Sequence, residues 1–420
     1  MKGTRVVAVV AAAAIVAALS ATDLAGARTS TDARGVTSNS ITVAGLTDGQ
    51  QPEAAQGAKA VFDSVNSTGG VFGRKINYLG GNIDKGDATQ DLTLGKQIVQ
   101  QNQAFAVVPV VTPVATGSAQ FFAQQHVPFF GWSIAPGMCN NPYGFGFTGC
   151  IVPPAPITNA GSTWGDLISK LYQSQGKGTA KGKTAAVIAE DGDSGRTGLP
   201  VIAASAKAAG MKVVYGKTAL PAPPAAVTDF SPYVNDILTS NNGKAPDAVF
   251  LVVQFSNVLG MAKQLQQSNY QGVVTNAVGY APAVTASMKG QEGFMQFSAP
   301  ESAPTNPNMA TVVATIKKSL GNDTVISQGM LSGYFSADFF VKALKKVGKN
   351  LTPEALAKAA SSMTYGISGT VGPTPYPTAL KFGTPCGSLV RSDGTAWHVD
   401  VPYGCYTNID IKTLKPIPQK

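Results

Sequence analysis

Ser194 is the side chain whose setting best matches a catalytic nucleophile, because it lies in the segment Gly192-Asp193-Ser194-Gly195. A serine hydrolase also needs a histidine that takes the hydroxyl proton and an acid that orients this histidine. His126 has none of the flanking residues typical of such a triad, and Arg196 stands where a glycine usually completes the nucleophile segment. We therefore interpret the segment as a turn between a strand and a helix, and we do not expect an enzyme.

The four cysteines form two pairs that are close in sequence, Cys139 with Cys150 and Cys386 with Cys405. In an exported chain, an even number of cysteines at such spacings favours local disulfides. Zinc binding is the alternative, but the chain has no Cys-x-x-Cys and only two histidines. We expect two structural disulfides and no metal ion.

Motifs for cofactor binding are missing from the sequence. No glycine-rich loop with a lysine could hold a phosphate, and no Gly-x-Gly-x-x-Gly follows the first apolar run. We therefore expect no cofactor.

Residues 1–27 have the pattern of a signal peptide. Lys2 and Arg5 precede an uncharged stretch at 6–19, and Ala25-Gly26-Ala27 supplies the small side chains that signal peptidase reads. The apolar stretch is shorter than the roughly 20 residues of a permanent membrane anchor. Ala27 also stands where a bacterial lipoprotein would have its lipid-bearing cysteine. We expect a secreted or periplasm-like protein without a lipid anchor.

The composition indicates a globular chain rather than a nucleic-acid-binding one. Charged residues make up 13% of the 420 residues and hydrophobic residues 44%, with a formal net charge of +9. The basic residues are scattered, and the one dense group, at 342–349, is interpreted as the solvated face of a helix. After the signal peptide about 390 residues remain, which is enough for two domains.

Short apolar runs alternate with amphipathic stretches of helical spacing, and this alternation occurs twice. The runs of the first series lie at 41–46, 76–79, 104–108 and 127–130, and those of the second at 185–189, 213–215, 248–253 and 273–276. Strands that alternate with helices predict parallel sheets covered on both faces. The sequence therefore predicts an α/β fold with two doubly wound parallel-sheet lobes. Ligands of such sheets bind beyond the carboxyl ends of the strands.

Several segments, in order along the chain, resemble the branched-chain amino-acid-type (Leu/Ile/Val-binding protein-like) solute-binding proteins. This family comprises type I periplasmic binding proteins that serve ABC importers. The segments that carry the resemblance are Gly69-Gly70-Val71-Phe72-Gly73-Arg74-Lys75-Ile76, 185–195, Thr228-Asp229-Phe230 with 246–250, and the late helices at 339–347 and 351–356.

The resemblance implies two lobes joined by three hinge strands, a Venus-flytrap fold that closes on a small-molecule solute and delivers it to a membrane permease. We expect a flexible segment at 28–39, lobe 1 at 40–155, lobe 2 at 156–281, a return to lobe 1 at 282–380 and a return to lobe 2 at 381–420. We expect a monomer that binds no nucleic acid. The alternative is an extracellular sensor of the same fold that acts on a signalling receptor.

The resemblance also implies which residues contact the solute. They follow strands of the two lobes: Thr112, Trp132, Ser133, Ser194, Gln254, Phe255 and Tyr280. In the family, an acidic residue in the loop that corresponds to 276–280 often holds the amino group of an amino acid, but this loop has no carboxylate here. A buried ammonium needs such an acceptor. We therefore expect an aromatic or partly apolar solute rather than a standard branched-chain amino acid.

Overall fold

The computed structural model describes residues 33–418. The predicted signal peptide at 1–27 and the first part of the segment at 28–39 lie outside these residues.

The first sheet has five parallel strands in the order β2-β1-β3-β4-β5. Their bounds are β1 Ser40–Thr47, β2 Lys75–Ile83, β3 Ala106–Val111, β4 Phe129–Gly131 and β5 Gly144–Gly146. The central strand β3 is buried along its whole length, as expected for a parallel strand that is covered on both faces. Val108 packs into one hydrophobic core and Val107 into another, so successive residues of β3 contribute to opposite sides of the sheet.

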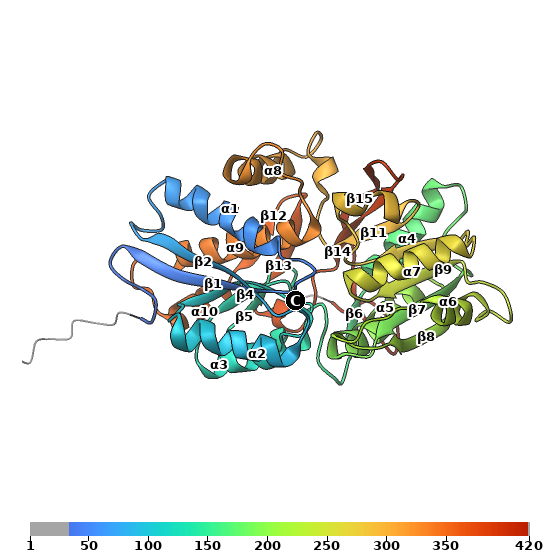
Figure 1. The fold of residues 1–420 in the computed structure, drawn as a ribbon, viewed down its shortest axis with the longest axis horizontal. Coiled ribbons are helices and arrows are strands. Elements are labelled where there is room, and N and C mark those ends of the chain that lie inside the picture. The colour runs from blue at the N-terminus through green and yellow to red at the C-terminus, as the bar shows by residue number, and fades with distance from the viewer. Residues whose placement is uncertain (1–32, 419–420) are drawn as a thin grey trace, which may run out of the picture. The chain divides into compact units, whose positions relative to one another are not determined.

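Helices cover both faces of this sheet. Helices α1 (Ala54–Ser67) and α9 (Gln328–Val347) pack together on one face, and α2 (Ala88–Lys96) and α3 (Thr116–Gln124) on the other (Figure 1). Phe62 of α1 and Phe340 of α9 meet edge to face with ring centroids 6.2 Å apart. Although α9 is far from α1 in sequence, its burial makes it part of the core of the first lobe.

The second sheet has seven strands in the order β15-β14-β11-β10-β9-β7-β8. Its parallel part comprises β7 Thr184–Glu190, β8 Lys212–Leu220, β9 Ala248–Val252, β10 Val273–Asn276 and β11 Glu292–Met295. The antiparallel hairpin of β14 (Cys386–Ser392) and β15 (Trp397–Cys405) extends one edge. Helices α4 (Thr163–Ser174) and α5 (Asp193–Ala208) share a core on one face, whereas α6 (Ser231–Leu238) and α7 (Phe255–Gln267) belong to the core on the other.

The remaining elements are two further helices of the first lobe, two small sheets and several single helical turns. Helix α8 (Pro307–Leu320) packs on α1, and α10 (Pro353–Ala360) packs on α9. Two small antiparallel sheets pair β12 (Thr364–Ile367) with β13 (Val371–Pro375) and β6 (Asn159–Gly161) with β16 (Asn408–Asp410). Single helical turns occur at Gln97–Gln101, Pro136–Met138, Pro282–Val284, Ala286–Met288, Pro300–Ser302 and Thr378–Leu380.

The return to the first lobe lies later in the chain than residue 282, where it was expected. Strand β11 pairs with β10, so the chain stays in the second sheet until Met295. Strand β11 was missed because it has only four residues and because the two helical turns before it look like the start of a helical region in the sequence.

Both expected disulfides are present, Cys139–Cys150 and Cys386–Cys405. The second joins the first residue of β14 to the last residue of β15, and the two cysteines are direct partners across the hairpin. The expectation of two local disulfides is thus confirmed, and no cysteine within residues 33–418 is free.

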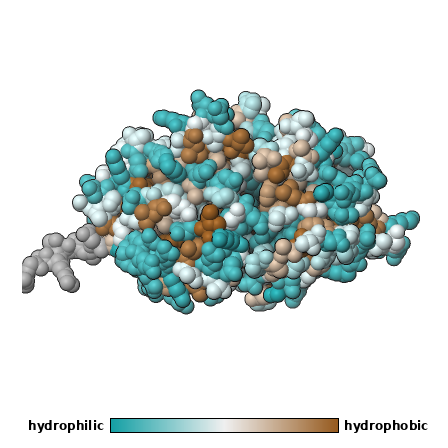
Figure 2. Space-filling model, in the orientation of Figure 1, coloured by the Kyte–Doolittle hydropathy of each residue, from teal (hydrophilic) through white to brown (hydrophobic). Residues whose placement is uncertain are grey.

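The surface is of mixed character. Figure 2 shows a face that is mostly hydrophilic, with hydrophobic residues in small scattered groups. In residues 33–418, no helix combines the length and the apolar character that crossing a bilayer requires.

Candidate functional site

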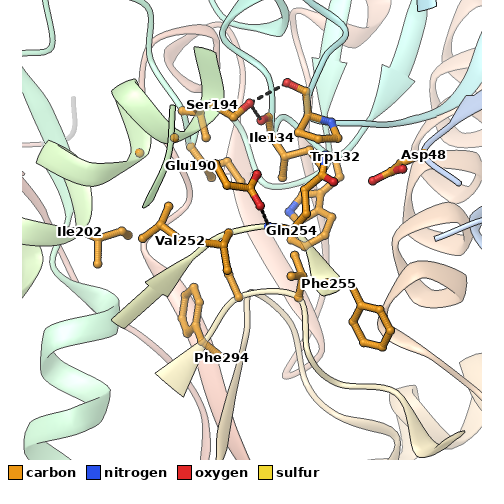
Figure 3. Close-up of a pocket in the computed structure, with 18 of the residues that line it drawn as sticks. Asp48, Trp132, Ile134, Glu190, Ser194, Ile202, Val252, Gln254, Phe255 and Phe294 are labelled. Atoms are coloured by element: carbon orange, nitrogen blue, oxygen red, sulfur yellow. Dashed lines mark hydrogen bonds between the residues drawn. The ribbon is translucent and has the colours of Figure 1, made fainter. Parts of the chain in front are cut away.

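A cavity of about 160 Å³ lies where loops of both sheets meet (Figure 3). From the first lobe it is lined by residues that follow β1, β3 and β4. From the second lobe it is lined by residues that end or follow β7, β9, β10 and β11. These are the carboxyl ends of parallel strands, where open α/β sheets bind their ligands.

The walls of the cavity are mainly apolar. Large side chains from both lobes line it, among them Trp132, Ile134, Trp164, Ile202, Val252 and Phe294. Trp164 stacks on Phe294 with ring centroids 4.7 Å apart, and its Nε1 donates to Thr275 Oγ1 at 2.9 Å. Trp132 Nε1 donates to Gln296 Oε1. Because both indole N–H groups already have partners, the tryptophans contribute apolar ring surface to the cavity.

Hydrogen bonds join the loops of the two lobes beside the cavity. Gln50 Nε2 donates to Gln254 Oε1 at 2.7 Å, and the backbone N–H of Ser256 donates to Gln50 Oε1 at 2.8 Å. Ser194 Oγ lies 2.6 Å from the carbonyl oxygen of Ile134 and 2.7 Å from that of Pro113 (Figure 3). Gln50, Ile134 and Pro113 belong to the first lobe, so the structure represents a closed arrangement of the loops.

Two carboxylates line the cavity, one from each lobe. Asp48 directly follows β1, and Glu190 is the last residue of β7; both side chains are largely buried. Burial raises the pKa of each carboxyl group above its ordinary value, while hydrogen bonds from backbone N–H groups lower it. Within the part of the chain that the structure describes, no lysine, arginine or histidine lines the cavity. The charged side chains that line the cavity, Asp48 and Glu190, are therefore both acidic.

The predicted ligand contacts divide into two groups. Trp132, Ser194, Gln254 and Phe255 all line the cavity. Thr112, Ser133 and Tyr280 are also buried, but they are not among the residues that line it. The hydroxyl of Tyr280 instead donates to Glu301 Oε1 at 2.7 Å, and its ring packs against Trp397.

Asp48 and Glu190 were missed by the sequence analysis, which considered an acidic residue only in the loop at 276–280. That loop indeed has no carboxylate, and its Ala277 and Val278 line the cavity. The signal that could have found both acids is their position. Each stands at the carboxyl end of a predicted strand, so the general rule for α/β sheets points to them without any resemblance.

Among residues 33–418, the hydroxyl of Ser194 contacts no histidine that could take its proton. Of the two histidines, His126 contacts Glu354 and His398 contacts Asp393, and both are exposed. The Ser194 hydroxyl instead holds the loops of the two lobes together. The segment Gly192-Asp193-Ser194-Gly195 is the turn from β7 into α5, as expected.

A sequence model of the periplasmic binding protein family matches residues 38–393 of the chain. No curated protein matches the sequence significantly.

Solved structures with the same fold share little sequence with the chain. The fatty acid ABC transporter substrate-binding protein from Thermomonospora curvata is 19% identical with a TM-score of 0.70, over 89% of this chain and 94% of that one. An ABC transporter solute-binding protein from Rhodopseudomonas palustris BisB5, in complex with 3,4-dihydroxy benzoic acid, is 18% identical with a TM-score of 0.65, over 87% and 97%. A leucine binding protein from Thermotoga maritima MSB8 is 13% identical with a TM-score of 0.66, over 86% and 97%.

These structures share the two-lobed α/β fold, and the family match covers most of the sequence. Proteins of this family bind solutes outside the cytoplasm for ABC transporters and are not enzymes. By the extent of that match, the chain belongs to the periplasmic binding protein family.

Proposed function

We propose that the protein captures one small, largely apolar solute in the cavity between its lobes and delivers it to the permease of an ABC importer. The solute is not a branched-chain amino acid. The observation that carries this proposal is the wall of aromatic and aliphatic side chains that both lobes contribute to one cavity.

The volume of the cavity limits the size of the solute. An engineered apolar cavity of about 150 Å³ holds one benzene molecule, and the cavity here has about 160 Å³. A neighbouring space of about 60 Å³ shares Trp164, Ile202 and Phe294 with it. A single ring with a short side chain, or an alkyl chain of similar volume, fits these dimensions.

The printed names of the structural neighbours support an apolar body without fixing its identity. One is a fatty acid transporter's binding protein, and another was solved with 3,4-dihydroxy benzoic acid. The fold thus accommodates aliphatic and aromatic solutes as well as leucine. The choice among them depends on the lining of the individual cavity.

Solute binding would be coupled to closure of the lobes. A solute that contacts Trp132 of the first lobe and Phe294 of the second gains its full contact area only when the loops meet. Such differential contact shifts the population toward the closed state. The permease then distinguishes the closed, loaded protein from the open one.

A thermal-shift screen over single-ring and alkyl compounds, with leucine and valine included, tests this proposal. A solute that binds only the folded protein adds about 2.7 kcal/mol of stability at a hundredfold excess over its Kd. We expect apolar single-ring or alkyl compounds to raise Tm and the branched-chain amino acids to leave it unchanged. A strong shift with leucine or valine would contradict the proposed solute class.

Trp132→Phe then tests whether the solute occupies this cavity. The substitution replaces the indole by a smaller phenyl ring and removes the hydrogen bond to Gln296. We therefore expect about tenfold weaker binding of any solute that the screen identifies. Trp397→Phe is the matched control, because Trp397 is also buried but does not line the cavity. Equal losses in both variants would assign the effect to general destabilisation.

We further propose that the chain is exported through cleavage after residue 27 and acts as a monomer. N-terminal sequencing of the exported protein, with light scattering on the same sample, tests both points. We expect a mature chain that starts near Arg28 and a mass of one copy.

A further inference from the structure

We propose that the solute carries a positively charged nitrogen, which is held between Asp48 of the first lobe and Glu190 of the second. The solute would thus be an apolar amine rather than a carboxylic acid or a zwitterion. This inference rests on the proposed function and specifies the chemical class of the solute for the same cavity.

Glu190 is arranged to act as an acceptor toward the cavity. Its Oε1 accepts hydrogen bonds from the backbone N–H of Gln254 at 2.8 Å and from Asn257 Nδ2 at 2.6 Å. These two bonds fix the carboxylate and favour its ionised form. Among residues 33–418, no group donates to Oε2, which leaves this oxygen available to a ligand in the cavity that Glu190 lines (Figure 3).

Asp48 has a similar arrangement on the opposite lobe. Its Oδ1 accepts from the backbone N–H of Gln50 at 3.1 Å, and no side chain within residues 33–418 donates to Oδ2. Asp48 is 6% exposed and Glu190 is 7% exposed. The two groups are also close enough that Asp48 raises the pKa of Glu190 by repulsion. Two carboxylates that repel each other across a cleft form a site for a cation.

An anionic solute would be disfavoured in this cavity. Among residues 33–418, no cationic side chain lines the cavity, so a carboxylate would lose its hydration beside two acids without a counter-charge. Gln50 Nε2 and Ser194 Oγ already join the lobes, and the amide groups of the other lining glutamines carry no charge. The same lack of a counter-charge disfavours the carboxylate half of an amino acid.

The aromatic walls are compatible with a cation as well as with an apolar body. The faces of tryptophan and phenylalanine rings attract ammonium groups, and Trp132 and Phe255 line the cavity together with the two acids. A nitrogen between Asp48 and Glu190 would also cancel the repulsion between the lobes. An amine would therefore favour closure more than a neutral compound of equal shape.

Three compounds with the same phenyl body and different end groups test the inference by calorimetric titration at pH 7. They are 2-phenylethylamine, 2-phenylethanol and 3-phenylpropanoate. A primary alkylamine resembles the lysine side chain, whose pKa is about 10.4, and is therefore charged at this pH. We expect the amine to bind at least about tenfold more tightly than the alcohol, and the carboxylate to bind most weakly.

Glu190→Gln and Asp48→Asn identify the groups that hold the nitrogen. Both substitutions keep the size of the side chain, and glutamine at 190 can still accept the two hydrogen bonds that Glu190 accepts. We expect each variant to weaken the amine by about tenfold or more while the alcohol changes by less than about threefold. Asp323→Asn changes the net charge equally at an exposed position and should leave all three affinities unchanged.

The outcomes separate this inference from the proposed function. If 3-phenylpropanoate binds as tightly as the amine and Trp132→Phe weakens it, the cavity binds apolar solutes but the inference is wrong. An equal loss of affinity for all three compounds in Glu190→Gln and Asp48→Asn would also overturn the inference. If none of the compounds binds, both the inference and the proposed size and class of the solute fail.

Discussion

At the scale of single residues, a position just after a strand predicted which residues line the cavity better than the residue type did. Trp132, Ser194, Gln254 and Phe255 line the cavity, and the family resemblance implied each of them at a position that follows a predicted strand. Tyr280 was selected in the same way, yet its hydroxyl and ring are engaged by Glu301 and Trp397. The sequence does not contain the direction of a side chain in a loop, because distant segments determine that direction.

Buried carboxyl groups outside the cavity make stability depend on pH. Burial raises the pKa of Asp84 to about 6 and that of Asp91 to about 7, and the neighbouring Asp84 raises the pKa of Asp91 further. Both side chains are fully buried, and neither oxygen of Asp91 has a hydrogen-bond partner within residues 33–418. The folded protein therefore holds these groups protonated at pH values where the unfolded chain ionises them.

We expect the free energy of unfolding to fall as pH rises from about 4 to about 7. Below the unfolded pKa of 3.8 both states are protonated, and the stabilisation is lost as pH passes the raised folded value. Asp91→Asn cannot ionise, so the total fall in the free energy of unfolding over this pH range should be smaller in this variant by on the order of 4 kcal/mol. Urea unfolding at several pH values measures this pH dependence of the free energy of unfolding, with Asp323→Asn as the exposed control. An unchanged slope in Asp91→Asn would contradict the raised pKa.

At the scale of elements, long periodic segments were predicted well and short ones were not. The strand predicted at 41–46 is β1 (Ser40–Thr47), and the late helix expected at 339–347 is the second half of α9 (Gln328–Val347). Thr352 caps α10, as its position before Pro353 indicates, by accepting from the backbone N–H of Ala355. The four-residue strand β11 was missed, because so short a run carries no periodicity.

The hairpin β14–β15 forms an edge of the second sheet, and the disulfide Cys386–Cys405 links its two strands. Replacing Cys386 and Cys405 together by alanine removes a link across 19 residues, and we expect a loss of about 3 kcal/mol in the free energy of unfolding. Urea unfolding of the double variant measures the loss. Replacing Cys139 and Cys150, whose link spans 11 residues, should cost slightly less. An unchanged urea midpoint after loss of Cys386–Cys405 would show that the strand pairing alone holds the hairpin.

At the scale of the whole molecule, the two-lobed α/β organisation was predictable from the doubled alternation of strands and helices. The point at which the chain returns to the first lobe was not, since it depends on the pairing of β11 with β10. The character of the cavity also appeared only in the structure. Asp48 and Glu190 are 142 positions apart in sequence, and only folding brings them to the same cavity.

The central claim is that the lobes enclose an apolar solute at an acidic site, with no cationic side chain among the described residues that line it. Side-by-side calorimetric titration of the unmodified protein with 2-phenylethylamine and with leucine tests it most directly, because both compounds have an apolar body and an amino group, whereas only leucine carries a carboxylate. We expect saturable one-to-one binding of the amine and no saturable binding of leucine. Saturable binding of leucine without binding of the amine would contradict it.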